Sequence, residues 1–196
     1  MGFGLGETGW LSGARHLASP NWDARPAEAQ VEVLIIHAIS LPVGVYGGPD
    51  VERLFTNQLD TESQPTYADL KGLRVSAHLF IRRDGQVVQF VPFTGRAWHA
   101  GVSRCEGRER VNDFSVGIEM EGTDRSPFEE AQYEALVQAS RVLLMRYPVI
   151  TADRLYGHSD IAPGRKSDPG PYFDWGRYRA AIRGVSSGSM VGDAGR

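Results

Sequence analysis

The first ordered pattern along the chain is a set of short apolar runs. Residues 31–37 (VEVLIIH) are rich in β-branched side chains and predict a buried strand that ends on a histidine. Residues 76–82 and 86–92 are two further apolar runs, and they flank the dipeptide Asp84-Gly85. Asp-Gly between apolar runs is typical of a tight β-hairpin. These patterns predict a sheet built from several short strands.

Residues 115–121 (SVGIEME) alternate between apolar and polar side chains. This spacing predicts a half-buried strand, because successive side chains of a strand point to opposite faces. The apolar face would carry Val116, Ile118 and Met120. The other face would carry two carboxylates, Glu119 and Glu121.

Helical spacing is clearest after residue 126. Ser126 has the character of an N-cap, with Pro127 at the first helical position and Glu129 able to reach back to the cap. Apolar residues then recur at helical spacing, and the helix is expected to end near Tyr147-Pro148. Shorter helices are expected over residues 50–55 and 175–182.

Together these elements predict an α/β (α+β) fold. It is expected to be a single domain over residues 9–183, with a central mixed sheet flanked by helices. Residues 184–196 are rich in Gly and Ser, and they are predicted to form a disordered C-terminal tail.

Composition narrows the class of protein. Hydrophobic residues make up 41% of the chain and charged residues 23%, with a net charge of -3, as in ordinary globular proteins. The mild acidity predicts no nucleic-acid partner and no polybasic membrane contact. Cys105 is the only cysteine, so no internal disulfide can form, and no apolar stretch is long enough to span a membrane. We therefore expect a soluble, cytoplasmic, monomeric protein.

Two places in the sequence could carry chemistry. His37 sits at the end of the first predicted strand and leads into a Pro/Gly-rich loop. The more ordinary interpretation of such a histidine is a hydrogen bond to the backbone at the edge of the core. Residues 157–170 combine one imidazole, two carboxylates and one lysine with several Pro and Gly residues, so no helix is expected there. The ordinary alternative for this segment is a solvated surface loop.

His37, His158 and Asp168 together offer two nitrogen ligands and one oxygen ligand. Zinc accepts such a set, and three protein ligands leave a fourth position for water, whose pKa then falls to about 7. Hydrolysis also needs a carboxylate to take the proton of the water and a cation to stabilise the oxyanion. Glu119 and Lys166 have the right chemistry for these two roles.

Five separated motifs resemble one family when taken in order. They are Leu34-Ile35-Ile36-His37, Arg74-Val75-Ser76-Ala77-His78, Arg96-Ala97-Trp98-His99-Ala100-Gly101, residues 112–119 (NDFSVGIE), and Gly157-His158 with residues 165–171 (RKSDPGP). The chain resembles the AmpD-type N-acetylmuramyl-L-alanine amidases of the wider amidase_2 and peptidoglycan-recognition-protein superfamily. The resemblance covers roughly residues 9–182.

The resemblance implies a zinc site in a groove at one face of the sheet. By position in the motifs, His37, His158 and Asp168 match the zinc ligands, Glu119 matches the catalytic carboxylate, and Lys166 matches the cation beside the scissile carbonyl. Glu121 lies on the same strand face as Glu119 and is the competing candidate for the base.

The implied substrate is a peptidoglycan fragment, the anhydro-muropeptide of cell-wall recycling. The bond cut joins the lactyl group of N-acetylmuramic acid to L-alanine, and the activity would affect peptidoglycan turnover and, through it, β-lactamase induction. Arg74, Trp98 and Arg110 match substrate contacts in the family. Arginines suit the free carboxylates of such fragments, and a Trp face suits a sugar ring, although Trp98 could equally be a core residue.

One position departs from the family pattern. Family members often carry Asn after the first ligand histidine, and here Ala38 takes that place, so a side-chain amide is missing. Of the other histidines, His78 is expected to be structural, His99 to lie in the groove, and His16 to lie at the surface or the edge of the core. Cys105 is expected in a loop.

Two other functions stay open at this point. Some proteins of this fold lack a ligand or the catalytic carboxylate and only bind peptidoglycan fragments, so a non-catalytic binding module is one alternative. A zinc hydrolase acting on another amide is the second, because fold does not fix substrate. The Gly-containing loops over residues 42–50 and 101–112 are candidate lids or walls of the groove.

Overall fold

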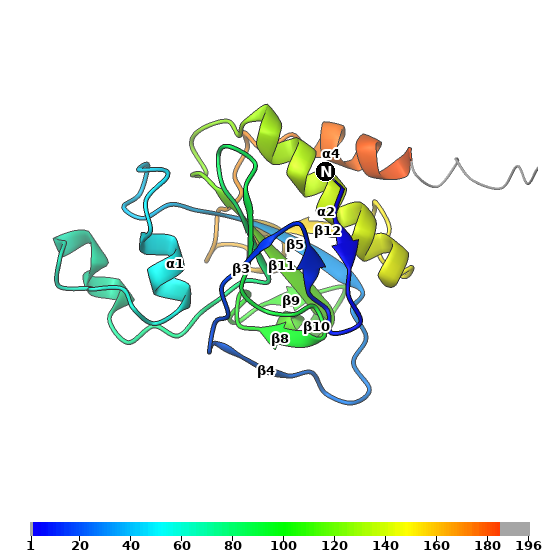
Figure 1. Ribbon diagram of the computed structural model, residues 1–196, viewed down its shortest axis with the longest axis horizontal. Helices are drawn as coiled ribbons and strands as arrows, with labels where there is room; N and C mark the ends of the chain where they lie inside the picture. The colour runs from blue at the N-terminus through cyan, green and yellow to red at the C-terminus, as the bar shows by residue number, and fades with distance from the viewer. Residues whose placement is uncertain (1, 185–196) are drawn as a thin grey trace, which may run out of the picture.

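The computed structural model describes residues 2–184, so the tail predicted for residues 184–196 lies almost wholly outside the described part (Figure 1). Within residues 2–184 the centre is a six-stranded mixed sheet in the order β12-β5-β11-β6-β7-β3. These strands are β3 (Arg15–His16), β5 (Val33–Ile39), β6 (Leu79–Ile81), β7 (Val87–Gln89), β11 (Ser115–Glu121) and β12 (Leu155–Gly157).

Shorter elements surround this sheet. Three two-stranded ribbons pair β1 (Gly4–Leu5) with β2 (Leu11–Ser12), β4 (Trp22–Ala24) with β8 (Gly95–Ala97), and β9 (Arg104–Cys105) with β10 (Arg108–Glu109). The helices are α1 (Asp50–Phe55), α2 (Glu130–Arg146), α3 (His158–Ile161) and α4 (Trp175–Arg183), with 3-10 turns η1 (Pro65–Leu70) and η2 (Val111–Phe114). None of the helices in this described range has the length and apolar character needed to cross a membrane.

The predicted mixed sheet flanked by helices is confirmed. The strands β12, β5, β11 and β6 run parallel, while β6 and β7 form the antiparallel hairpin expected around Asp84-Gly85. Both hairpin strands are shorter than the apolar runs that predicted them. In the parallel pair β5–β11, His37 stands opposite Glu119. Paired residues of neighbouring strands point to the same face, so this register places both side chains on one side of the sheet.

The strand β11 is buried on both faces, so the prediction of a half-buried strand is wrong. On one face Val116, Ile118 and Met120 join the main apolar cluster beneath α2 and α4, the two helices seen together above the sheet in Figure 1. Parallel strands need crossover connections that cover both faces of a sheet, and the short sequence window could not reveal that second cover. The opposite face is covered by a cluster around α1 and by another around β9 and η2.

Helix α2 begins three residues later than the sequence predicted. Its N-cap is Glu129, whose backbone N–H donates to Oε1 of Gln132 at 3.0 Å. The hydroxyl of Ser126 is used elsewhere, within 3.0 Å of the Thr123 hydroxyl and 3.2 Å of the Tyr46 hydroxyl. Gln132 then fixes the start of the helix to the sheet, because its Nε2 donates to the main-chain oxygens of β6 and β11. The predicted end of α2 before Pro148 is confirmed, as are α1 and α4.

Two smaller expectations are also corrected. Residues 158–161 form the helical turn α3, where no helix was expected. Asp160 allows this turn, since its Oδ2 accepts the Gly157 N–H at 2.7 Å, and the helix breakers Pro163 and Gly164 come only after the turn has ended. Cys105 lies in β9 rather than in a loop, and it is a buried free thiol.

Candidate metal centre

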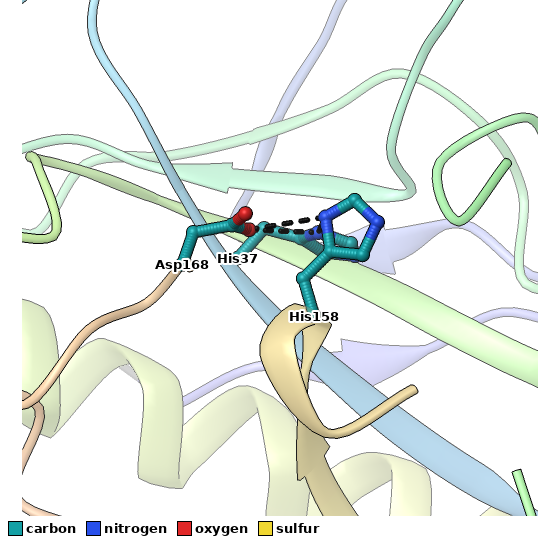
Figure 2. A group of neighbouring side chains, drawn as sticks. All are labelled: His37, His158 and Asp168. Carbon is teal, nitrogen blue, oxygen red and sulfur yellow. Dashed lines mark hydrogen bonds and ion pairs between the residues drawn. The ribbon is translucent and has the colours of Figure 1, made fainter. Parts of the chain in front are cut away.

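Three side chains from distant parts of the chain converge at the edge where β5 and β12 end (Figure 2). His37 lies near the end of β5. His158 opens α3 directly after β12, and Asp168 follows in the next loop. Because Gly157 pairs with Ile36, the parallel register brings His158 level with His37. The sheet topology therefore builds this cluster from the predicted ligand residues.

The distances within the cluster fit a metal ion. The two Nδ1 atoms of His37 and His158 lie 2.9 Å apart, and Oδ2 of Asp168 lies 3.3 Å from the first and 3.2 Å from the second. Ligand atoms bonded at 2.0–2.1 Å to a tetrahedral ion are about 3.3 Å apart. His37, His158 and Asp168 therefore form a group that could hold a metal ion.

The hydrogen bonds of the histidines point to the same conclusion. Nε2 of His158 lies 3.1 Å from the Ala100 carbonyl oxygen, which can only accept, so this nitrogen carries the proton in a neutral ring. The Nδ1 lone pair of His158 then faces Nδ1 of His37 and the carboxylate of Asp168. Burial lowers the pKa of His37 to about 4, so the His37 ring is neutral at pH 7. A cation between these atoms would satisfy lone pairs that otherwise face one another.

Asp168 is ionised in this arrangement. Burial alone would raise the pKa of its carboxyl, but hydrogen bonds with His158 and His37 hold that pKa well below its usual value. Neutral imidazole and ionised carboxylate are the forms in which these residues bind metals.

Glu119 is the nearest further carboxylate. Its Oε2 is buried and lacks a hydrogen-bond partner among the described residues. Burial, together with the charge of Asp168, raises the pKa of Glu119 well above its usual value, while Lys166 acts in the opposite direction. A divalent cation beside Asp168 would offset that negative charge and favour the ionised form of Glu119.

The structure separates Glu119 from its competitor. Glu121 points from the same face of β11, but its Oε1 accepts the Gly47 N–H at 2.6 Å and its Oε2 accepts the Arg83 N–H at 3.0 Å. The first bond fastens the loop over residues 42–49, and the second fastens the turn between β6 and β7. The carboxylate of Glu121 is thus bound to backbone amides, whereas Glu119 lines the cleft beside the metal centre.

The metal centre opens into a cleft of about 430 Å³. The polar part of its lining includes Glu119, His158, Lys166 and Asp168. The apolar part of its lining includes Ile39, Leu41, Val43, Leu54, Phe55, Leu70, Leu73 and Val75. The arrangement suits a ligand with a polar reacting group and a less polar body.

The three predicted substrate contacts are placed differently from one another. Arg74 is exposed at the rim, between Leu73 and Val75, which line the cleft. Arg110 is exposed, lies beside a neighbouring hollow, and donates to Asp113 at 3.0 Å. Trp98 is partly buried, and like Arg110 it is not part of the cleft lining. Ala38, in contrast, does line the cleft.

The remaining histidines divide as the sequence suggested, with one addition. His78 is buried and structural, since its Nδ1 accepts the Gly117 N–H and its Nε2 lies 3.1 Å from the Gly95 oxygen. His16 is exposed. His99 lines the cleft as expected, but it also lies 3.0 Å from Nε2 of His37, a contact that no local sequence pattern signals.

The two predicted loops have defined attachments. Val43 in the first loop lines the cleft, and Tyr46 contacts Ser126 there. The second loop contains the hairpin of β9 and β10. Whether either loop moves stays a prediction.

Comparisons with known proteins agree with this geometry. The sequence profile of the N-acetylmuramoyl-L-alanine amidase family matches residues 27–171. A curated relative from Enterobacter cloacae, named 1,6-anhydro-N-acetylmuramyl-L-alanine amidase AmpD, is 55% identical over 90% of this chain and 94% of its own length. A crystal structure of a selenomethionine AmpD derivative is 52% identical, with a TM-score of 0.88 over 91% of this chain and 99% of that one.

A third protein is more distant and carries a ligand. It is the amidase AmiD from E. coli in complex with the substrate anhydro-N-acetylmuramic acid-L-Ala-D-gamma-Glu-L-Lys, at 31% identity and a TM-score of 0.57. The match covers 92% of this chain and 65% of that one.

Proposed function

Because the chain belongs to the N-acetylmuramoyl-L-alanine amidase family, we propose that it is a zinc enzyme acting on soluble cell-wall fragments. The bond it cuts is the amide between the lactyl group of 1,6-anhydro-N-acetylmuramic acid and L-alanine. The observation that carries the proposal is the convergence of His37, His158 and Asp168 beside the unpartnered carboxylate of Glu119 in one cleft. A module that only binds such fragments would not need this complete set.

His37, His158 and Asp168 would hold the zinc ion. Two nitrogen ligands and one oxygen ligand suit zinc, and three protein ligands leave one position open. When bound, zinc supplies a Lewis acid that lowers the pKa of water to about 7 and polarises a carbonyl. Calcium and magnesium prefer all-oxygen sites, which disfavours them here.

Glu119 would act as the general base and then as the general acid. Its carboxylate takes a proton from the attacking water and delivers it to the departing amine of L-alanine, so that no net proton is gained or lost by the protein. Oε2 of Glu119 has no hydrogen-bond partner among the described residues, so this oxygen is available to accept the proton of the water. Lys166, which lines the same cleft, would stabilise the negative oxygen that develops on the former carbonyl.

The substrate class rests on the names of relatives and on the shape of the cleft. The relative from Enterobacter cloacae is named for 1,6-anhydro-N-acetylmuramyl-L-alanine, and the AmiD complex holds an anhydro-muramyl tripeptide. The apolar wall suits the methyl groups and the sugar ring of such a molecule. Arg74, with Arg110 farther away, would attract its carboxylates, and Trp98 is proposed as an outer contact.

Several wider properties belong to the same proposal. Fragments of this kind arise in cell-wall recycling, so we place the reaction in the cytoplasm, where it would affect peptidoglycan turnover and β-lactamase induction. We further propose that the protein acts as a monomer, since one chain supplies all the groups named above.

The decisive experiment uses a defined anhydro-muropeptide. Purified protein is incubated with it, with and without a metal chelator, and free peptide is measured by mass spectrometry. Peptide release that stops with the chelator and returns with added zinc is expected. Asp168→Ala should lose both zinc and turnover, whereas Asp153→Ala, at an exposed aspartate paired with Arg183, should lose neither. Full zinc occupancy in Asp168→Ala, or turnover that resists the chelator, would contradict the proposal.

A further inference from the structure

A chain of buried polar side chains leads from His37 away from the metal centre. Nε2 of His37 lies 3.0 Å from Nδ1 of His99, and Nε2 of His99 lies 3.0 Å from the Ser115 hydroxyl. All three residues are buried. The side of His37 that faces away from the other two candidate ligands is therefore in contact with protein groups rather than with water.

The position of the His99 ring is fixed from two directions. Gly117 lies directly beneath it, because a Cβ added at residue 117 would come within 2.4 Å of the ring. Asn112 holds the backbone beside it, since its Oδ1 accepts the N–H groups of His99 at 3.3 Å and of Ala100 at 2.9 Å. The rings of His37 and His99 stand at 84° to each other with centroids 5.1 Å apart. The contact is thus a directed hydrogen bond and not a stack.

The direction of each bond follows from the valence of imidazole. A metal held by Nδ1 of His37 needs the lone pair on that atom, so the proton of the ring must be on Nε2. Nδ1 of His99 must then accept the hydrogen bond from this Nε2–H, and the neutral His99 ring carries its own proton on Nε2. Ser115 accepts this last N–H, which its hydroxyl oxygen can do.

The other histidine of the centre has a different support. Nε2 of His158 contacts the carbonyl oxygen of Ala100, a main-chain atom that no substitution removes. The Nε2 atom of His37, in contrast, has its contact with a side chain, His99, which in turn contacts Ser115. Its support can therefore be removed by mutation.

We propose that His99 and Ser115 are positioning residues that fix the tautomer and orientation of His37 and thereby increase the affinity for zinc. This inference rests on the proposed function, because it takes His37 as a zinc ligand. Outer hydrogen-bond partners of metal-bound histidines typically contribute 10- to 100-fold to metal affinity.

The test compares variants that differ in hydrogen bonding but hardly in shape. His99→Leu removes the acceptor beside His37, whereas His99→Asn places an amide oxygen where Nδ1 stood. Ser115→Ala removes the last acceptor of the chain. Ser140→Ala is the matched control, since Ser140 is equally buried but bonds only to the Tyr178 hydroxyl, 2.7 Å away in the helical layer. Zinc affinity is measured by competition with a chromogenic chelator at fixed pH, and folding by near-ultraviolet circular dichroism.

We expect His99→Leu and Ser115→Ala to bind zinc about 10- to 100-fold more weakly, with His99→Asn recovering most of the loss and Ser140→Ala unchanged. Wild-type affinity in His99→Leu, or equal losses in His99→Asn and His99→Leu, would overturn the inference and leave the proposed function intact. A wild-type protein that binds no zinc would overturn both.

A second measurement does not depend on any variant. In zinc-loaded, nitrogen-15-labelled wild-type protein, the proton of His37 should be found on Nε2 and that of His99 on Nε2. A zinc-loaded His99 with its proton on Nδ1 would exclude the bond to His37 and overturn the inference, even if every substitution prevented folding.

Discussion

The seven residues of β11 alternate between its two faces, and the two faces place different demands on the side chains they carry. The face toward α2 carries Val116, Ile118 and Met120, which all pack into the main apolar cluster. The opposite face carries one residue for each of four tasks. Ser115 ends the hydrogen-bond chain from His99, Gly117 leaves room for the His99 ring, Glu119 faces the cleft, and Glu121 fastens a loop.

This difference shows what the sequence must specify on each side. A core face needs volume, and similar apolar residues exchange there at modest cost. The face toward the metal centre needs particular partners, so two carboxylates only two residues apart serve unrelated purposes. The following experiments, in order of expected effect, test how far this separation of the two faces holds.

The largest effect is expected from Glu119→Gln. This change keeps the shape of the side chain but removes the base, so turnover of an anhydro-muropeptide should fall about 10²- to 10⁴-fold. Zinc content should stay at the wild-type level, because Glu119 is not a ligand. The matched change on the other face, Ile118→Val, should cost about 0.5–1.5 kcal/mol of unfolding free energy and leave turnover unchanged. Near wild-type turnover in Glu119→Gln would remove Glu119 from the mechanism.

A smaller effect is expected from Glu121→Ala. The amides of Gly47 and Arg83 lose their acceptor, and we expect the free energy of unfolding to fall by about 3 kcal/mol, since two amides are left without partners. Turnover per folded molecule should fall far less than in Glu119→Gln. Denaturant unfolding and steady-state kinetics measure the two quantities. Glu134→Ala, on the exposed side of α2, is the control. A loss of turnover in Glu121→Ala as large as that in Glu119→Gln would mean that the two carboxylates are not separate.

The smallest effect concerns His78, which supports Gly117 from the side of the neighbouring strand. Burial lowers the pKa of His78 to about 3, whereas an unfolded histidine has a pKa of about 6.5. Between these values the unfolded chain binds the extra proton and the folded chain does not, so stability rises with pH through this window. Lowering the pH from 7 to 5 should therefore cost roughly 2 kcal/mol from His78 alone.

Denaturant unfolding of the zinc-free protein at both pH values measures the combined cost of its buried histidines, because the lowered pKa of His37 acts in the same direction. The NMR signals of the His78 ring should also show no protonation down to pH 5. A ring that titrates near pH 6.5 would contradict the burial argument.

Local patterns were enough to predict the framework. The β-branched run ending on His37, the Asp84-Gly85 turn and the helix over residues 50–55 all depend on neighbours in sequence, and the structure contains each of them. The convergence of His37, His158 and Asp168 was predictable because strand ends and Pro/Gly loops present polar groups, and the family motifs joined the two segments. These features needed no knowledge of distant contacts.

The features that could not be predicted from the sequence depend on contacts between residues that lie far apart along the chain. Ser126 has the right chemistry for an N-cap, but its hydroxyl contacts Thr123 and Tyr46, and Glu129 takes the cap instead. The second buried face of β11 depends on elements far along the chain. The contact between His99 and His37 likewise requires the open space above Gly117, which becomes apparent only in three dimensions.

The strand order β12-β5-β11 has a consequence for how the protein is made. Two of the three candidate ligands, His158 and Asp168, follow β12, the strand that comes last within residues 2–184, while His37 belongs to the earlier β5. Translation proceeds from the N-terminus at about 5–20 residues per second. A nascent chain therefore contains His37 and Glu119 for some seconds before His158 and Asp168 are added. A product of premature termination before residue 168 would therefore lack a complete metal site. Hydrolytic activity would begin only once translation has passed that residue, which keeps unfinished chains on the ribosome from cutting cell-wall fragments.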